Sequence, residues 1–334
     1  MRTDLLELLC CPNCKGDLVL REPVERDGRV ESGHLDCAGC SRSTPITRFI
    51  PRFAPEDNYA SSFGFQWGKF RRTQLDSYSG APISRDRFFL QSGWDPADLD
   101  GKRVLDAGCG AGRFAEVALD CGATVVAVDY SSAIDAAYEN LGDNQRFHGL
   151  QADIMALPLR EDSFDFVYCF GVLQHTADAR AALLSLPAPL RPGGRLAVDV
   201  YMKTGMEMLW PKYWLRPVTK RMERQRLFRL VSTLAPPLLP VSSLVGKAPK
   251  IGRRLRYLVP VVNYEGVLPL NREQVRDWAI LDTFDMLSPA FDQPQSPETL
   301  TRWMTEAGMS DVEVVRTGHL VGRGVNRRVP ASAE

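Results

Sequence analysis

The sequence lacks the features that mark a secreted, membrane-spanning or nucleic-acid-coating protein. Its 334 residues carry 41 basic and 41 acidic side chains, so the net charge points to no nucleic-acid or membrane partner. The first residues, MRTDLLELL, place acids inside the apolar run, unlike a secretory signal. No uninterrupted apolar run reaches the roughly 20 residues of a spanning helix. The nearest, 230–246, is interrupted by Pro236, Pro237 and Pro240. We expect a cytoplasmic protein.

Eight cysteines are present, and five of them lie in the first 40 residues. Two Cys-x-x-Cys pairs, Cys11 with Cys14 and Cys37 with Cys40, are separated by 22 residues. This is the spacing of a four-thiolate zinc site, whereas a redox Cys-x-x-Cys needs no second pair. Cys10 is expected to pack with the preceding leucines. A closed four-thiolate site predicts structural Zn2+ and a reducing, intracellular setting.

Apolar strands alternate with helical stretches over residues 101–200, which predicts an α/β fold with a parallel, doubly wound sheet. In such sheets the ligand lies beyond the carboxyl ends of the strands. The strands are expected at 104–106, 124–128, 146–151, 164–170 and 195–200, with helices at 113–121, 133–141 and 177–186.

The first of these strands runs into a turn that carries Gly108, Gly110 and Gly112. The dinucleotide-binding pattern Gly-x-Gly-x-x-Gly would place its last glycine at position 113, which is Arg113. The observed Gly-x-Gly-x-Gly departs from that pattern. It suits a strand whose backbone lies against the amino-acid and ribose parts of a sulfonium nucleoside.

The stretch VLDAGCGAGRF, residues 104–114, resembles the first motif of class I S-adenosylmethionine-dependent methyltransferases. Further stretches follow in the order of that family, namely VVAVDY, QADIMALPL, EDSFDFVYCFGVLQHTAD and LRPGGRLAVDVY. The resemblance implies a Rossmann-like, seven-stranded, mostly parallel sheet. It also implies a methyltransferase that uses S-adenosyl-L-methionine.

The resemblance assigns cofactor contacts to particular side chains. Asp129 would accept the ribose hydroxyls, and Asp153 the adenine amino group, with Ile154 against the ring. Asp106 either orients the cofactor's amino group or caps the turn. The implied set is Gln66, Trp67, Asp106, Gly108, Gly110, Gly112, Asp129, Tyr130, Asp153, Ile154 and Phe170.

Three further side chains have two interpretations each. Gln66 and Trp67 precede the core, where related enzymes close a lid over the cofactor, but they could also form a buried aromatic hinge. His175 follows the fourth strand of the core. It is the candidate base for an oxygen acceptor, or else a structural histidine that caps the next helix.

The predicted organisation has three parts. Residues 1–54 form the zinc ribbon, 55–100 an aromatic and basic linker with the cofactor lid, and 101–325 the methyltransferase domain. Within the last part, 201–270 is expected to be a helical insertion over the active site.

The insertion is strongly basic. Residues 201–260 hold 13 lysines and arginines against two glutamates. Met222, Leu227 and Leu230 can share one apolar side of a helix. Three roles remain open: a lid whose arginines are solvated or pair with the acidic body, a pocket for an anionic substrate, and a membrane-surface helix that delivers a lipid-linked substrate.

The C-terminal part completes the expected fold. Ser296 and Pro297 mark a helix start, and DVEVV after Gly308 reads as a strand of the seventh-strand hairpin. Asp282 and Asp285 could face the substrate, but we expect them to pair with the basic insertion.

The predicted function is methyl transfer to a small-molecule acceptor, such as a metabolite, glycan or lipid intermediate. One alternative is a ribosomal RNA base methyltransferase whose zinc ribbon recognises RNA. The zero net charge, the lack of an aromatic-basic stacking platform and the missing Asn-Pro-Pro-Tyr-type signature disfavour it. The other alternative is a non-catalytic cofactor-binding partner protein.

Overall fold

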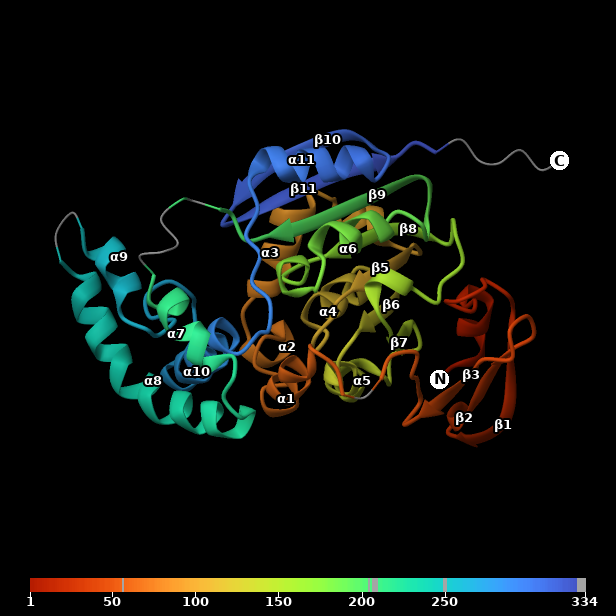
Figure 1. The fold of residues 1–334 in the computed structure, drawn as a ribbon, viewed down its shortest axis with the longest axis horizontal. Coiled ribbons are helices and arrows are strands. Elements are labelled where there is room, and N and C mark those ends of the chain that lie inside the picture. The colour runs from red at the N-terminus through yellow and green to blue at the C-terminus, as the bar shows by residue number, and fades with distance from the viewer. Residues whose placement is uncertain (56, 204, 206–209, 249–250, 329–334) are drawn as a thin grey trace.

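The computed structural model describes residues 1–55, 57–203, 205, 210–248 and 251–328 (Figure 1). Three parts lie side by side. A small N-terminal sheet and a helical lobe flank a central sheet with helices on both of its faces. The small sheet is antiparallel in the order β1-β2-β3-β4. Its strands are Leu18–Arg26, Arg29–Cys37, Ser43–Thr47 and Ile50–Pro51.

The central sheet has seven strands in the order β10-β11-β9-β8-β5-β6-β7. β5 to β9 pair in parallel, and β11 pairs antiparallel with both β9 and β10. This is the expected Rossmann-like sheet with its added hairpin. The strands are β5 Arg103–Ala107, β6 Thr124–Asp129, β7 Phe147–Gln151, β8 Phe164–Cys169, β9 Leu190–Val200, β10 Met309–Thr317 and β11 His319–Asn326.

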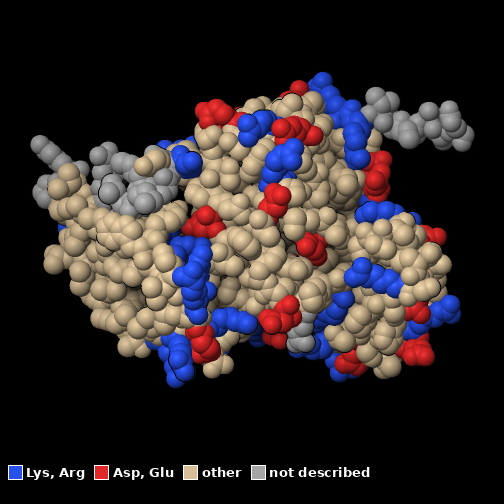
Figure 2. Space-filling view, in the orientation of Figure 1, with Lys and Arg blue, Asp and Glu red and all other residues tan. Residues whose placement is uncertain are grey.

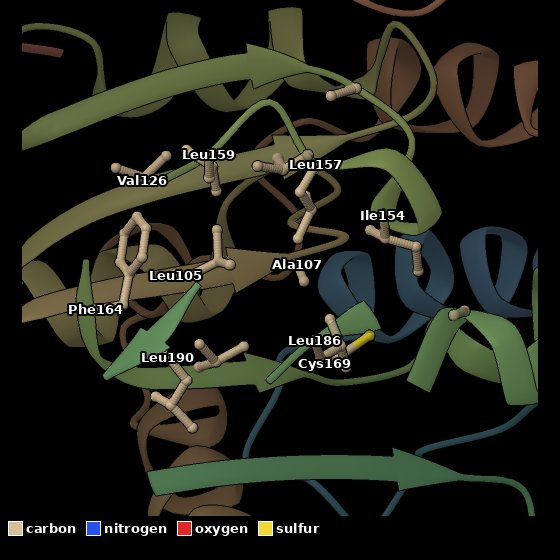
Figure 3. Close-up of a cluster of buried hydrophobic side chains, with 14 of the residues drawn as sticks. Leu105, Ala107, Val126, Ile154, Leu157, Leu159, Phe164, Cys169, Leu186 and Leu190 are labelled. Carbon is tan, nitrogen blue, oxygen red and sulfur yellow. The ribbon is translucent and has the colours of Figure 1, made fainter. Parts of the chain in front are cut away.

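Alternation along the strands supplies both faces of this sheet with a core. Leu105 and Val126 belong to one buried cluster together with Phe164 (Figure 3). Their neighbours Val104 and Val125 belong to a second cluster on the other face. The strands are therefore apolar on both faces, as expected for a parallel sheet covered by helices.

The helices before the insertion include α1 Ser61–Lys69, α2 Asp76–Ser79 and α3 Ile83–Ser92. Within the core, α4 Arg113–Asp120, α5 Ala133–Leu141 and α6 Ala179–Ser185 agree with the predicted helices to within two residues at each end. The later helices are α7 Pro211–Thr219, α8 Arg224–Gly246, α9 Gly252–Leu255, α10 Arg272–Leu287 and α11 Pro297–Glu306. Ser296 caps α11 by accepting from Thr299 N, as predicted.

The N-terminal ribbon shares its core with the central domain. Leu9 and Ile46 belong to the same buried cluster as Leu159 of the core. Leu9 also forms a bridge with Leu159, and Phe53 N donates to Gln151 O at the end of β7 (2.7 Å). The ribbon therefore covers one edge of the main sheet.

The insertion differs from the expectation in two respects. The sequence predicts that three prolines interrupt the run 230–246, whereas α8 is continuous through Pro236, Pro237 and Pro240. A proline lacks the N–H and frees a carbonyl one turn earlier. Because α8 lies at the surface, water can satisfy such groups.

The apolar side expected for Met222, Leu227 and Leu230 is only partly confirmed, because Met222 and Leu227 pack in one cluster and Leu230 does not. Met222 precedes the helix, Leu227 is buried, and Leu230 is 43% exposed. The buried side of α8 instead carries Leu227 and Val231, which share a cluster with Phe284 of α10. Positions 204, 206–209 and 249–250 of the insertion lie outside the described residues.

Candidate functional site

The glycine-rich turn follows β5 where the strand order of the sheet reverses, the usual ligand position in this architecture. Gly108 and Gly110 have φ values of 93° and 54°, in the region that favours glycine. A Cβ on Gly108 would lie 2.3 Å from Val172 Cγ2, and one on Gly110 would lie 3.0 Å from Trp67 Nε1. The loop after β8 and helix α1 thus close on the bare turn from two sides.

The third glycine of the motif has a different neighbour. A Cβ on Gly112 would lie 2.7 Å from Leu141 Cδ1, so this glycine allows α5 to pack against the turn. Arg113, at the position of the missing dinucleotide-pattern glycine, is directed away into hydrogen bonds with Gln74 (2.7 Å) and Ser84 (3.2 Å).

Asp129 lies at the end of β6 and is buried. It accepts hydrogen bonds from Gly110 N (3.0 Å), Ser131 N (2.8 Å) and Ser131 Oγ (2.7 Å). Burial raises its pKa, and the three donors oppose that rise. Because a carboxylate has about four acceptor sites, Asp129 can bind both ribose hydroxyls only if the Ser131 hydroxyl turns away.

Asp106 is buried beneath the same turn. Its Oδ2 and the Tyr168 hydroxyl have no well-aligned hydrogen-bond partner among the described residues, although the two groups lie close enough for Tyr168 to lower the pKa of Asp106 somewhat. Gly108 N and Cys109 N both donate to Val128 O instead, so Asp106 does not cap the turn. Burial raises the pKa of Asp106 to about 8. An unpartnered buried carboxyl oxygen is what the cofactor's amino group requires.

Asp153 follows β7 and lies beside two tyrosines. Its Oδ1 accepts from Met155 N (2.9 Å) and thereby begins the turn Ile154–Ala156. The rings of Tyr59 and Tyr130 are 5.1 Å apart. Burial and then the charge of Asp153 raise the pKa of both hydroxyls, that of Tyr59 to about 12. The three side chains can form one wall of an adenine pocket.

Two other predicted contact residues belong mainly to the hydrophobic core. Ile154 lies in the cluster shared with the ribbon, and the Phe170 ring is 5.4 Å from Tyr168 and 5.5 Å from Phe114. Both follow directly on residues at the cofactor edge of the sheet. Ile154 and Phe170 can therefore stabilise the cofactor edge of the sheet by packing in the core beside it.

Helix α1 connects the glycine-rich turn to the insertion. Trp67 lies against Gly110, while Gln66 is buried and its Nε2 donates to Asp285 Oδ1 of α10 at 3.4 Å. Gln66 Oε1 has no partner among the described residues. A Cβ on Gly64 would lie 2.2 Å from Ser132 Oγ, so α1 also rests directly on the start of α5. This placement suits a lid over the cofactor.

His175 is buried in the short turn after β8. Its Nδ1 lies 3.0 Å from Phe291 O and must donate the proton, because a carbonyl only accepts. Burial lowers the pKa of His175 to about 4. Helix α6 is capped by Asp178, which accepts from Ala181 N, so the proposed role of His175 as a helix cap is wrong. The imidazole is neutral at pH 7, with Nε2 free of a proton.

Two acids of α10 lie partly buried on the side of the helix that faces α1. Asp282 accepts from Gln74 Nε2 (3.3 Å) and from the Tyr264 hydroxyl, and Asp285 accepts from Gln66. Burial raises the pKa of both carboxyls to about 6. They are thus poised to change charge just below neutral pH.

The expected ion pairs between these acids and the basic insertion are not formed by the described residues, and that prediction is wrong. Lys212 and Arg216 pair with Asp292 at 3.0 and 3.8 Å, and Arg224 reaches Asp57 at 3.7 Å. Asp292 is buried and lies just after α10, within reach of α7. Asp292 therefore forms the ion pairs with Lys212 and Arg216 that were expected for Asp282 and Asp285.

Tyr201 completes the polar surroundings at the end of β9. Its ring lies 5.4 Å from that of His175, 5.7 Å from that of His319 and 5.0 Å from Lys212 Nζ. Burial and then the charge of Asp285 raise the pKa of its hydroxyl. Residues from the sheet, α1, α7 and α10 thus converge beyond the carboxyl ends of β8 and β9.

The four predicted zinc ligands meet at one point. The Sγ atoms of Cys11, Cys14, Cys37 and Cys40 all lie within 4.8 Å of one another. Cys11 and Cys40 are 3.6 Å apart, and Cys14 and Cys37 are 3.4 Å apart. A zinc tetrahedron with Zn–S bonds of about 2.3 Å has edges of about 3.8 Å. Cys10 is buried outside the cluster, as expected. The donor set fits Zn2+.

Several residues of this site were not foreseen. Val172, Ser131 and Tyr59 contact the cofactor side, and Tyr201 and Tyr264 lie on the acceptor side. Tyr201 could have been predicted from the sequence, because it follows directly on the predicted strand 195–200. Tyr59 and Tyr264 stand in segments of irregular pattern, which gave no signal.

Comparison with known proteins identifies a known domain in the central part of the chain. Residues 105–198 match the family model described as "Methyltransferase domain". This range begins in β5 and ends in β9, so it contains the glycine-rich turn, Asp129, Asp153 and His175. The resemblance to methyltransferases is confirmed for these residues.

Curated relatives agree over the same part. The chain is 30% identical over 129 residues to "O-methyltransferase rstn1" of Aspergillus nomiae, covering 37% of this chain and 57% of that one. It is 37% identical over 100 residues to a "Ubiquinone biosynthesis O-methyltransferase" of Coxiella burnetii, covering 29% of this chain and 43% of that one. The chain thus spans about half the length of these relatives. The crystal structure of a methyltransferase from Methanococcus maripaludis, assigned to the S-adenosyl-L-methionine-dependent class, aligns with a TM-score of 0.45 and 13% identity, over 83% of this chain and 98% of that one.

Proposed function

We propose that this protein transfers a methyl group from S-adenosylmethionine to a small polar acceptor held between the sheet, α1 and α10. The observation that carries the proposal is the bare turn at Gly108 and Gly110, set between Asp129 and the unpartnered Asp106, inside a matched methyltransferase domain. The cofactor supplies an activated methyl group when bound. The chain must orient an acceptor in line with it and exclude water.

The acceptor side favours a small molecule with a hydroxyl group. The groups there are a buried imidazole and amide and partly buried carboxyls and phenols, and they come from segments distant in the sequence. Such groups satisfy a compact polar ligand, whereas an RNA ligand requires an open basic groove.

Asp285 is the better candidate for a general base. A base works best when its pKa lies near the working pH, and Asp285 at about 6 is closer than His175 at about 4. Asp285 is also held by Gln66, whose neighbour Trp67 lies on the glycine-rich turn. This contact ties the base to the cofactor lid. His175 would then orient the acceptor through its free Nε2.

Cofactor binding should release a proton at pH 7. Asp106, with a pKa of about 8, is mostly protonated there, and a neighbouring ammonium group lowers the pKa of a carboxyl. Calorimetric titration with S-adenosylmethionine in buffers of different ionisation enthalpy should show release of close to one proton. Asp106→Asn should abolish this release. An equal proton count in the variant would contradict the assigned contact.

Turnover should rise with pH through about 6, because the base is active only when ionised. We expect Asp285→Asn to lower kcat by about 100-fold or more and to remove this limb of the pH profile. His175→Gln serves as the matched control and should keep the limb. The assay follows labelled cofactor with a pool of hydroxylated metabolites. A limb lost only in His175→Gln would transfer the base role to that residue.

A further inference from the structure

The insertion carries most of the exposed apolar side chains of this protein. Among the described residues, 15 large hydrophobic side chains are exposed, and 11 of these lie between positions 214 and 267. Single exposed hydrophobic residues are ordinary, whereas a concentration of them marks a contact surface. In Figure 2 the part of this lobe below the grey atoms, where Figure 1 places α8, shows a broad surface without charged side chains.

Helix α8 arranges part of this surface as a stripe. Leu230, Leu234, Val241 and Leu244 are 43%, 48%, 48% and 72% exposed. Their spacing of four, seven and three residues places them on one side of the helix. The adjoining side of the helix, which carries Leu227, Val231 and Ala235, is buried against α10. α8 therefore has two apolar faces, of which only one is covered by the described residues. We call the four exposed residues the α8 stripe.

Basic side chains surround the stripe. Exposed arginines and lysines stand before α8, in its first turns and just after its end, and α8 itself contains no acid. Some of them make short-range contacts, such as Arg221 with Pro217 O and Arg226 with Glu223, but the excess of positive charge remains. The exposed basic residues are Lys220, Arg221, Arg224, Arg226, Arg229 and Lys247.

We propose that the α8 stripe and its basic flanks dock this protein on the surface of an anionic lipid bilayer. An apolar helix face immersed at the level of the headgroups, with arginines and lysines beside it, is the pattern of an interfacial helix. Each basic residue near an anionic leaflet adds an attraction that salt weakens. The charge of the insertion is thus complementary to this partner.

The geometry favours a helix that lies on the membrane over one that crosses it. α8 meets the length and composition of a spanning helix, but its inner face is packed on α10. A helix that crossed the membrane would lose the packing of this face against α10. The carbonyls freed by Pro236, Pro237 and Pro240 would also lose water in hydrocarbon, whereas the headgroup layer can solvate them.

Docking by this face would bring the acceptor site to the membrane. The inner face of α8 packs on α10, which carries Asp282 and Asp285. Phe228 of α8 also lies 5.6 Å from Phe65 of α1, one residue before Gln66. The surface stripe and the proposed lid are therefore parts of one packed unit.

The test is flotation of the full chain with vesicles of phosphatidylcholine alone and with added phosphatidylserine. We expect binding to the anionic vesicles, weakened by salt. The double variant Leu234→Ser, Leu244→Ser should reduce the bound fraction by about tenfold or more, since both side chains lose their apolar insertion. The matched control is Val24→Ser, Leu90→Ser, two equally exposed apolar residues far from the insertion, which should bind as the parent does.

Three outcomes would overturn the proposal. The parent protein could fail to bind either kind of vesicle. The α8 double variant could bind as well as the control. Light scattering could show that the α8 variant dissociates a dimer without changing vesicle binding, which would make the stripe a contact between two copies. Unchanged cofactor affinity and thermal unfolding in both variants would show that they remain folded.

Discussion

Replacing Asp129 with alanine is expected to lower the affinity for S-adenosylmethionine by about 100-fold. Two charge-assisted hydrogen bonds to the ribose contribute about 1.5 kcal/mol or more each, and about 2.7 kcal/mol corresponds to this factor. The substitution also leaves the Gly110 and Ser131 N–H groups without their acceptor, which loosens the turn itself. Isothermal titration with the cofactor and with its demethylated product measures the effect.

Two companion variants separate the ribose contact from general damage. Asp129→Asn keeps one acceptor oxygen and the side-chain volume, so its affinity should fall between those of the parent and the alanine variant. Asp143→Ala removes a fully exposed carboxylate that pairs with Arg29 and should leave the affinity unchanged. Unaltered binding by Asp129→Ala would refute the proposed cofactor site at the glycine-rich turn, together with the methyl-transfer function.

Replacing Cys14 with serine is expected to cost the protein its zinc and much of its thermal stability. Structural zinc contributes on the order of 10 kcal/mol to the folding of small zinc domains. The loss should reach beyond the ribbon, because Leu9 and Ile46 share a buried cluster with Leu159 of the central domain. We expect the melting temperature to fall by on the order of 10 °C, with zinc content determined by elemental analysis.

Cysteines outside the cluster provide the controls for this experiment. Cys10→Ser and Cys121→Ser should keep one zinc per chain, since neither sulfur belongs to the group of four. Zinc loss in Cys10→Ser would show that Cys10 is a ligand. A Cys14→Ser variant with full zinc content and an unchanged melting temperature would refute a structural role for the site.

The elements of the central sheet could be predicted because their signals are local. The strand ending at Asp129 is an apolar run closed by an acid, and α5 occupies the predicted residues 133–141. The predictions that proved wrong concern features that depend on residues distant in the sequence. Prolines usually end a helix, but α8 continues through three of them at the surface of the protein. Asp282 and Asp285 were assigned to the insertion cations, yet Asp292 takes Lys212 and Arg216.

The sequence by itself determined the zinc ligands and the glycine-rich turn. In both cases the chemistry depends on local spacing: the turn carries its glycines at every second residue, and each Cys-x-x-Cys turn aims two sulfurs at one point, with a single hairpin bringing the two turns together. Only the tertiary structure decided the acceptor side and the α8 stripe. His175, Tyr201 and Asp285 are far apart along the chain and meet because α10 packs beneath the insertion. The stripe is exposed because α10 covers just one of the two apolar faces of α8, a choice that hydrophobic pattern alone does not encode.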